Sequence, residues 1–293
     1  MRCVTTLTCL LATLIARPIA AADLSAEVVL RSIEQGQGLL KTQQRPDGSW
    51  RAESQPDHIV GITSLGVLAL LNSGMTVRDR PVQRGLEFLR RIPSGEPRET
   101  YDVSLMIMAL AAARDPQRTD FARVTILAKW LEDSQVTQGK VGAWTYGDRN
   151  SLGGGDPSNT QFAVLALREA VDFGVQVSPV VWERARDYWE TIQSPDGGWG
   201  YGGGGGSTGS MTAAGISSLA IVQHMLRNDD GVAPDGTPPC CRPEDPYPAL
   251  ERGIRWLGDH FAAGHNPNNA GWLLYYIYGV ERAGRLSGRR FFG

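Results

Sequence analysis

A short motif that occurs twice constrains the fold of this chain more than any other feature. One copy reads Gln-Arg-Pro-Asp-Gly-Ser-Trp at positions 44–50, and the other reads Gln-Ser-Pro-Asp-Gly-Gly-Trp at positions 193–199. Each copy follows an amphipathic segment and precedes an apolar segment rich in Gly and Ala. Internal repetition of this kind is the signature of repeat architectures, in which one supersecondary unit stacks on the next.

The residues of this turn motif suit a connection between two helices. Pro fixes φ, Gly accepts a positive φ, and the Asp carboxylate accepts hydrogen bonds from turn or helix-start amides. We expect the Gln to hydrogen-bond main chain at the end of the preceding helix and the Trp to cover the apolar joint between units. This role is structural, and it is predicted for Gln44, Asp47, Gly48, Trp50, Gln193, Asp196, Gly197 and Trp199, and for Trp144 in a degenerate copy.

Helix pairs account for the rest of the pattern. Five segments place Gly, Ala or an apolar residue before a pair of large residues, with two residues between them, at 35–40, 84–89, 126–131, 184–189 and 252–257. A more apolar helix is predicted after each, at 58–72, 101–114, 158–173, 211–226 and 269–283. A helix that is apolar nearly all round is buried on both sides. We therefore expect an outer ring of amphipathic helices around an inner ring, in an all-α fold without sustained strand patterns.

These units resemble the QW repeat of squalene and oxidosqualene cyclases, an architecture also found in protein prenyltransferase β subunits. The resemblance depends on the basic-small-x-x-aromatic pattern and Gln of 184–193, followed by Gly-x-Trp at 197–199. The segments at 156–167 and 210–215 similarly resemble exported bacterial proteins with the prenyltransferase/squalene oxidase repeat. The resemblance implies an α/α toroid with a central cavity. Such toroids usually close with six helix pairs, whereas five are legible here.

The two ends of the sequence carry separate expectations. A signal peptide is predicted at 1–22, because the sequence has a basic start at Arg2, an apolar run at 4–15 and a small-residue cleavage site at Ala20-Ala21-Ala22. The run is shorter than the roughly 20 residues that span a bilayer, so no transmembrane segment is predicted in the mature chain. We expect residues 23–293 to form one toroid domain, exported to the periplasm or outside the cell. At 287–293 the sequence resembles the approach to a sixth pair, so either the ring is open or the chain is truncated.

The sequence lacks the catalytic motifs of the cyclases and prenyltransferases that it resembles. The Asp-x-Asp-Asp acid of the cyclases does not occur, and isolated Asp102 and Asp156 at helix starts are more typical of N-caps. Asp259, His260 and His265 show no metal-ligand spacing toward Cys240 and Cys241, so no metal and no cofactor is predicted. The formal net charge of -2 gives no bias toward nucleic acid.

Polar residues near the starts of the inner helices are the candidates for lining the cavity. If the toroid forms, these starts gather on one face, where exposed amides and positive helix ends favour an anionic or hydroxyl-bearing ligand. Helix capping is the alternative interpretation for each of them. The candidates are Asp57, His58, Tyr101, Asp102, Asn159, Gln161 and Thr212.

Three functions follow from these observations. The leading one is an exported, non-catalytic toroid that binds a hydrophobic or isoprenoid-like ligand, or a protein partner, at its central cavity. The second is a divergent terpenoid cyclase or prenyl transferase acting on an isoprenoid substrate, with its acid at a nonstandard position. The third is a structural module of a larger envelope-associated protein. Catalysis is left open by the sequence.

Overall fold

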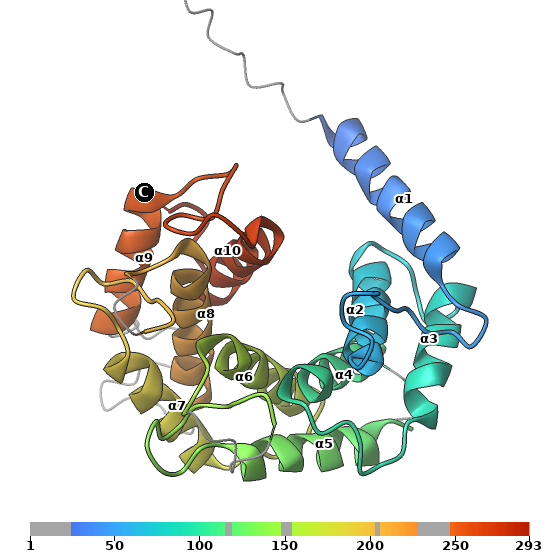
Figure 1. The fold of residues 1–293 in the computed structure, drawn as a ribbon, viewed down its shortest axis with the longest axis horizontal. Coiled ribbons are helices and arrows are strands. Elements are labelled where there is room, and N and C mark those ends of the chain that lie inside the picture. The colour runs from blue at the N-terminus through green and yellow to red at the C-terminus, as the bar shows by residue number, and fades with distance from the viewer. Residues whose placement is uncertain (1–24, 115–118, 148–153, 203–205, 228–246, 293) are drawn as a thin grey trace, which may run out of the picture.

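The computed structural model describes residues 25–114, 119–147, 154–202, 206–227 and 247–292. In these residues ten α-helices follow one another along an open arc (Figure 1). The described part of the chain contains no strand, and Asn266 and Asn269 form an isolated β-bridge. The predicted all-α class and the five helix pairs are thus confirmed. The predicted signal peptide and the adjacent Cys240 and Cys241 lie outside the described residues.

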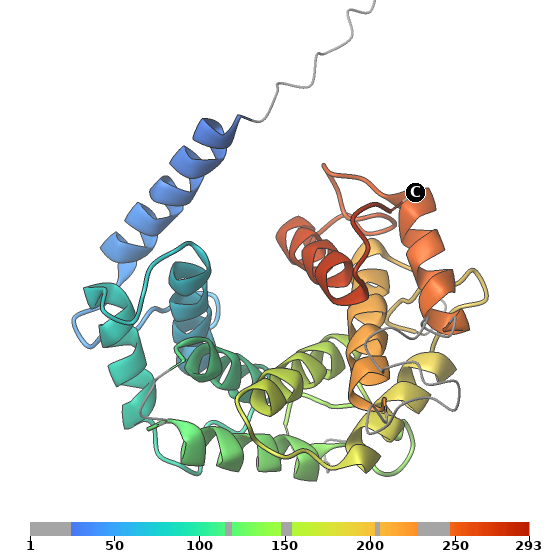
Figure 2. The same ribbon diagram turned by 180° about the vertical axis from the view of Figure 1, so that it is seen from behind.

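The helices alternate between two layers, as Figures 1 and 2 show from opposite sides. The outer layer consists of α1 (Ala26–Gln43), α3 (Arg80–Arg91), α5 (Phe121–Ser134), α7 (Pro179–Thr191) and α9 (Pro248–His260). The inner layer consists of α2 (Ile59–Asn72), α4 (Thr100–Ala112), α6 (Pro157–Asp172), α8 (Gly209–Met225) and α10 (Leu273–Ser287). Each inner helix packs against the next inner helix along the arc.

Burial follows position along the arc. Helices α4, α6 and α8 have inner neighbours on both sides and are buried over most of their length, as their apolar patterns predict. Helices α2 and α10 stand at the two ends, where Leu65 and Leu274 are 53% and 85% exposed. The last inner helix was expected at 269–283 but begins at Leu273, because Trp272 adopts a left-handed conformation (φ 63°) that ends the preceding turn.

The tryptophans of the turn motif cover the joints between units, as predicted. The Nε1–H of Trp199 donates to the carbonyl of Trp189 at 2.8 Å, and its backbone N–H donates to Thr212 Oγ1 at 3.1 Å. Each tryptophan therefore ties the preceding outer helix to the following inner helix. Trp50 makes the same two bonds with Leu40 and Thr63, and Trp144 makes them with Leu131 and Thr160.

The glutamines of the turn motif connect to a different helix from the one expected. Gln193 Nε2 donates to the carbonyls of Gly197 and Ala249, each at 2.8 Å. Ala249 lies in the first turn of α9, so the amide reaches forward to the next outer helix rather than back to the preceding one. Gly197 supplies the turn with its φ of 92°. Gln44 makes the same pair of bonds with Gly48 and Pro81, and Gln135 makes them with Gly142 and Val181.

The aspartates of the turn motif accept hydrogen bonds from their own turns, as expected. Asp47 accepts from the Ser49 amide at 3.0 Å, and this bond lowers the pKa of Asp47. Asp196 accepts from Gly198 N and Trp256 Nε1, each at 3.0 Å. Desolvation raises the pKa of Asp196, but these hydrogen bonds and one from Ser207 outweigh it, so that the net shift is downward.

The joint between α3 and α5 lacks the turn motif and is held by arginines instead. Arg90 forms a two-pronged ion pair with buried Asp120, at 3.0 and 2.7 Å. Arg123 donates to the carbonyl of Ile92, the residue that ends α3, at 2.7 Å. Charge-assisted bonds thus replace the Gln and Trp contacts where the sequence repeat is degenerate.

Candidate functional site

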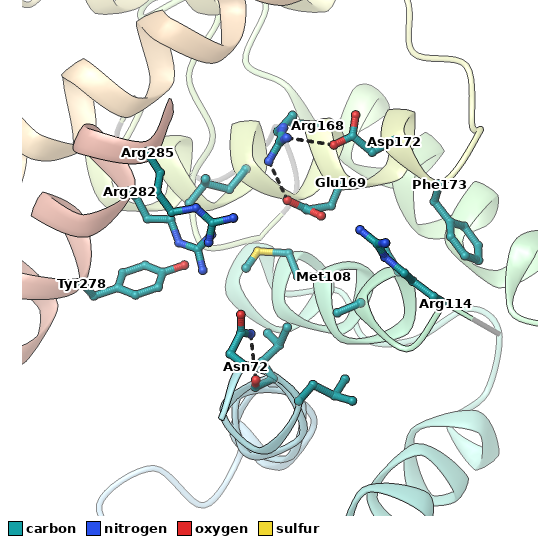
Figure 3. Close-up of a pocket in the computed structure, with 15 residues that line it drawn as sticks. Asn72, Met108, Arg114, Arg168, Glu169, Asp172, Phe173, Tyr278, Arg282 and Arg285 are labelled. Atoms are coloured by element: carbon teal, nitrogen blue, oxygen red, sulfur yellow. Dashed lines mark hydrogen bonds and ion pairs between the residues drawn. The ribbon is translucent and has the colours of Figure 1, made fainter. Parts of the chain in front are cut away.

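A groove lies on the inner side of the arc, at the C-terminal ends of α2, α4 and α6 and beside the last turns of α10 (Figure 3). Its volume is about 730 Å³. The apolar part of its lining comes from three inner helices and the residue after α6: Leu68, Leu71, Met108, Leu165 and Phe173. The volume falls within the range typical of small-molecule sites.

Four arginines and two carboxylates line the same groove, so its net charge is positive. Arg168 pairs with both carboxylates, Glu169 and Asp172, each at 3.0 Å. Arg285 lies 3.4 Å from Glu281, one turn earlier on α10. Arg114 is exposed just after α4, with a left-handed φ of 46°. Arginines near helix C-termini are favoured by the helix dipole in any protein, so the apolar lining beneath them is the more informative feature.

Arg282 has the most distinctive surroundings of these arginines. Its guanidinium lies 5.1 Å from the centre of the Tyr278 ring, a cation–π distance. Its Nε is 3.2 Å from Glu281 Oε2, but the angles are not those of a hydrogen bond. This buried nitrogen has no hydrogen-bond acceptor in the described part of the chain. Arg282 as a whole lines the groove, and guanidinium groups bind carboxylates and phosphates through paired N–H donors, so an anionic ligand oxygen can pair with its accessible part.

A row of aromatic rings leads from the groove toward the opposite ends of the inner helices. Phe162 lies between Tyr278, at 6.3 Å between ring centroids, and Tyr101, at 4.8 Å. Tyr275 stacks on the same Phe162 at 6.4 Å and donates its hydroxyl to Gln161 Oε1 at 2.6 Å. Burial raises the pKa of Tyr275 well above its usual value, so its hydroxyl stays protonated as a donor.

His58 and Asp102, which the sequence proposed for the cavity, pair with each other. Asp102 Oδ2 lies 3.1 Å from His58 Nδ1, and Oδ1 accepts the Gly61 amide at 2.7 Å. Burial raises the pKa of Asp102, while His58 and Gly61 oppose that rise. Because both carboxylate oxygens are engaged, the pair fastens the start of α4 to the start of α2.

The remaining candidates divide between the aromatic row and the packing of the turns. Tyr101 and Gln161 are brought together through Phe162 and Tyr275. Buried Asn159 donates to Asp156 Oδ1 at 3.0 Å, whereas its own Oδ1 has no partner in the described residues. Thr212 is fully buried against the Trp199 turn, and Asp57 is exposed before α2. None of these residues lines the groove with the arginines.

Sequence reasoning missed the arginines of the groove. Arg168, Arg282 and Arg285 stand in the C-terminal halves of largely apolar inner helices. Charged residues within an apolar pattern are the sequence signal that could have identified them. The candidates were chosen instead at helix N-termini, where most polar groups are consumed by capping and by contacts between helices.

The structure also bears on metal binding and membrane insertion. The described residues contain no group of three or more His, Cys, Asp or Glu arranged to hold a metal ion. His260 stacks on Trp256 with ring centroids 4.1 Å apart. None of the described helices combines the length and apolar character needed to cross a bilayer.

Comparison with known proteins identifies the fold. No family model and no curated protein matches the chain. Among solved structures, it is similar to an ent-copalyl diphosphate synthase from Streptomyces platensis, with a TM-score of 0.55 and 19% sequence identity. The match covers 86% of this chain and 46% of the synthase, so the chain spans about half the length of that protein. The chain therefore has a terpenoid cyclase-like α/α toroid fold, and the narrower QW-repeat resemblance stays a prediction.

Proposed function

We propose that this chain is a binding protein whose inner groove holds an amphipathic anion, namely an isoprenoid-like hydrocarbon chain with an anionic head group. The observation that carries the proposal is the combination of an apolar groove of about 730 Å³ with four lining arginines. The hydrocarbon chain would lie on the apolar lining, and the head would pair with the arginines. Arginine is well suited to this task because its planar donors match carboxylate and phosphate oxygens.

Binding without catalysis is the form of this proposal that the described residues favour. The acid motif of the resembling cyclases is missing, and both oxygens of Asp102 are held by His58 and Gly61. The alternative is a divergent terpenoid cyclase or prenyl transferase. The raised pKa of buried Asp102 favours it, because a carboxylic acid that stays protonated is what alkene protonation requires. A fold similar to that of a diphosphate synthase agrees with both functions.

Titration calorimetry on the mature chain tests the proposal with three probes. Farnesyl diphosphate carries tail and head, inorganic diphosphate carries the head alone, and squalene carries the tail alone. We expect farnesyl diphosphate to bind more tightly than either part, and Arg282→Gln to weaken its binding by roughly tenfold or more. Arg186→Gln, on the outer helix α7, is the matched control and should leave affinity unchanged.

The same preparations separate binding from catalysis. Incubation with farnesyl diphosphate or squalene, followed by product analysis, should return the substrate intact. Conversion that disappears in Asp102→Asn would establish the enzyme alternative. Equal affinity for diphosphate alone and for farnesyl diphosphate would contradict the amphipathic ligand.

We also propose that the mature protein is exported, on the basis of the basic, apolar and small-residue pattern of positions 1–22. Expression of the full chain in a bacterium, followed by mass measurement of the periplasmic and secreted protein, should give a species that begins near Asp23. Recovery of only the uncleaved chain in the cytoplasm would contradict export.

A further inference from the structure

Two further cavities adjoin the groove along the C-terminal ends of the inner helices. The first, the middle cavity, has a volume of about 330 Å³, is lined mainly by α8 and α10, and shares Arg168 and Arg285 with the groove. The second, the outer cavity, has a volume of about 650 Å³, lies at the start of α9, and shares Gln223, Leu250 and Ser287 with the middle cavity. Because neighbouring spaces share wall residues, the three lie in series from the inner side of the arc to its outer layer.

The middle cavity has the most one-sided charge of the three. Arg168, Arg227 and Arg285 line it together with His224, and its described lining contains no carboxylate. The carboxylates that pair with Arg168 and Arg285 are not part of this lining. Across the whole chain, by contrast, acidic residues slightly outnumber basic ones, 31 to 29. An anionic group that reaches the shared wall of Arg168 and Arg285 is therefore better stabilised on the side of the middle cavity than among the two carboxylates of the groove.

The outer cavity offers hydrogen-bond donors and acceptors side by side. Its polar lining consists of Gln223, Tyr247, Glu251, Arg252, Arg255 and Ser287. Two of these side chains are held in place by other residues: Glu251 accepts from Arg289 at 2.7 Å, and the Tyr247 hydroxyl donates to Glu190 at 2.6 Å. Hydroxyl groups both donate and accept hydrogen bonds, so a lining that supplies both partners suits a group with several hydroxyls, such as a sugar.

We propose that the three spaces together bind an isoprenoid diphosphate esterified with a saccharide. The hydrocarbon chain lies in the groove, the diphosphate extends from Arg168 and Arg285 into the middle cavity, and the saccharide occupies the outer cavity. This inference rests on the proposed function and names the class of its ligand. The linings follow one another as the parts of such a molecule do, from apolar through cationic to hydrogen-bonding. Charge-assisted bonds from arginines match the phosphoryl oxygens in the centre.

Titration calorimetry on the mature chain tests the proposal with two esters of farnesyl diphosphate. One carries N-acetylglucosamine on the terminal phosphate and the other carries methyl, so the two have the same charge and differ only in the sugar. We expect the saccharide ester to bind about tenfold more tightly, because the sugar adds hydrogen bonds in the outer cavity. Arg255 is exposed and lines the outer cavity but neither of the other two spaces. Arg255→Gln should therefore remove most of this advantage and leave the affinity for the methyl ester unchanged.

Three further variants complete the test. Ile254→Trp narrows the outer cavity and should also weaken only the saccharide ester, with circular dichroism confirming that the variant is folded. Arg285→Gln, at the wall between groove and middle cavity, should weaken both esters equally. Arg186→Gln, on the outer helix α7, should weaken neither.

The outcomes separate this inference from the function on which it rests. Farnesyl diphosphate itself is the reference ligand, and its failure to bind would overturn both proposals. Equal affinity of the two esters, in a protein that binds farnesyl diphosphate, would overturn the saccharide alone. A saccharide advantage that survives both Arg255→Gln and Ile254→Trp would do the same, because the sugar would then lie outside the outer cavity.

Discussion

The N-terminal and C-terminal ends of the inner helices differ in how many of their polar side chains have hydrogen-bond partners within the protein. At the N-terminal ends, the Gln, Asp and Trp of the turn motif have internal partners, and Asp102 is held by two groups. At the C-terminal ends, arginines face a groove, and buried Arg282 Nε has no hydrogen-bond acceptor among the described residues. The repeated residues are therefore committed to the scaffold, whereas the arginines that do not repeat line a groove, three of them in ion pairs with neighbouring carboxylates.

Removal of a motif tryptophan should have the largest effect on stability. Trp199 is fully buried, and Trp199→Ala leaves a cavity between α7, α8 and α9. We expect the free energy of unfolding to fall by about 3–5 kcal/mol in urea denaturation. Trp272→Ala is the matched control: Trp272 is 72% exposed, and its loss should change stability by less than about 0.5 kcal/mol. Equal losses in the two variants would refute the scaffold role of the motif.

Overpacking the same joint should have the next largest effect. A Cβ atom at Gly253 on α9 would lie 2.4 Å from the Trp199 ring, so one of them must move. We expect Gly253→Ala to destabilise the protein by about 1–3 kcal/mol, measured by thermal and urea unfolding. Gly36→Ala on α1 is the control, because nothing lies within 4 Å of its Cβ position. There alanine should stabilise by about 0.5–1 kcal/mol through helix propensity.

Two carboxylates should give pH dependences of opposite sign. The lowered pKa of Asp196 contributes stability above its unfolded pKa of about 3.9, and this contribution is lost as the pH falls through the folded pKa. The raised pKa of Asp102 contributes stability below the unfolded pKa, and this contribution is lost as the pH rises through the folded pKa.

Urea unfolding at about pH 3 and about pH 7 measures both effects. Asp196→Asn should be more harmful at the higher pH, and Asp102→Asn should be more harmful at the lower pH. Asp196 is largely exposed, so solvent screening should keep its effect below about 1 kcal/mol. Parallel pH trends in the two variants would contradict this difference between the turn and the contact of α4 with α2.

Much of the scaffold was predictable because its signals are local. The spacing of Gln, Gly and Trp predicted the turns, and the apolar patterns predicted which helices are inner. The forward reach of Gln193 to Ala249 was not predictable, since it depends on which outer helix lies over the turn. The equivalent role of Gln135 was hidden because residues 136–141 interrupt the motif spacing.

The candidate site was less predictable because it is assembled across the arc. Arg168 on α6 and Arg285 on α10 are far apart in sequence and meet only through the curvature of the inner layer. The helix dipole favours ligand charge at the opposite ends of the inner helices, but there His58 and Asp102 pair with each other and join α2 to α4. Dipole arguments identify favourable positions for charge, but they do not reveal which polar groups the packing has already consumed.

The smallest effect on stability should come from Arg285→Gln, which should nevertheless weaken ligand binding. Arg285 is exposed, and its ion pair with Glu281 spans one helical turn, an arrangement that contributes about 0.3–0.5 kcal/mol. Arg285→Gln should therefore leave the free energy of unfolding within about 0.5 kcal/mol of wild type. The same change removes a cation from the groove, so farnesyl diphosphate should bind roughly tenfold more weakly by calorimetry. Gly253→Ala should show the reverse, with reduced stability and nearly unchanged affinity in the folded protein. If Arg285→Gln reduced stability and affinity in proportion, the groove would belong to the scaffold, and the contrast between the two ends of the inner helices would be lost.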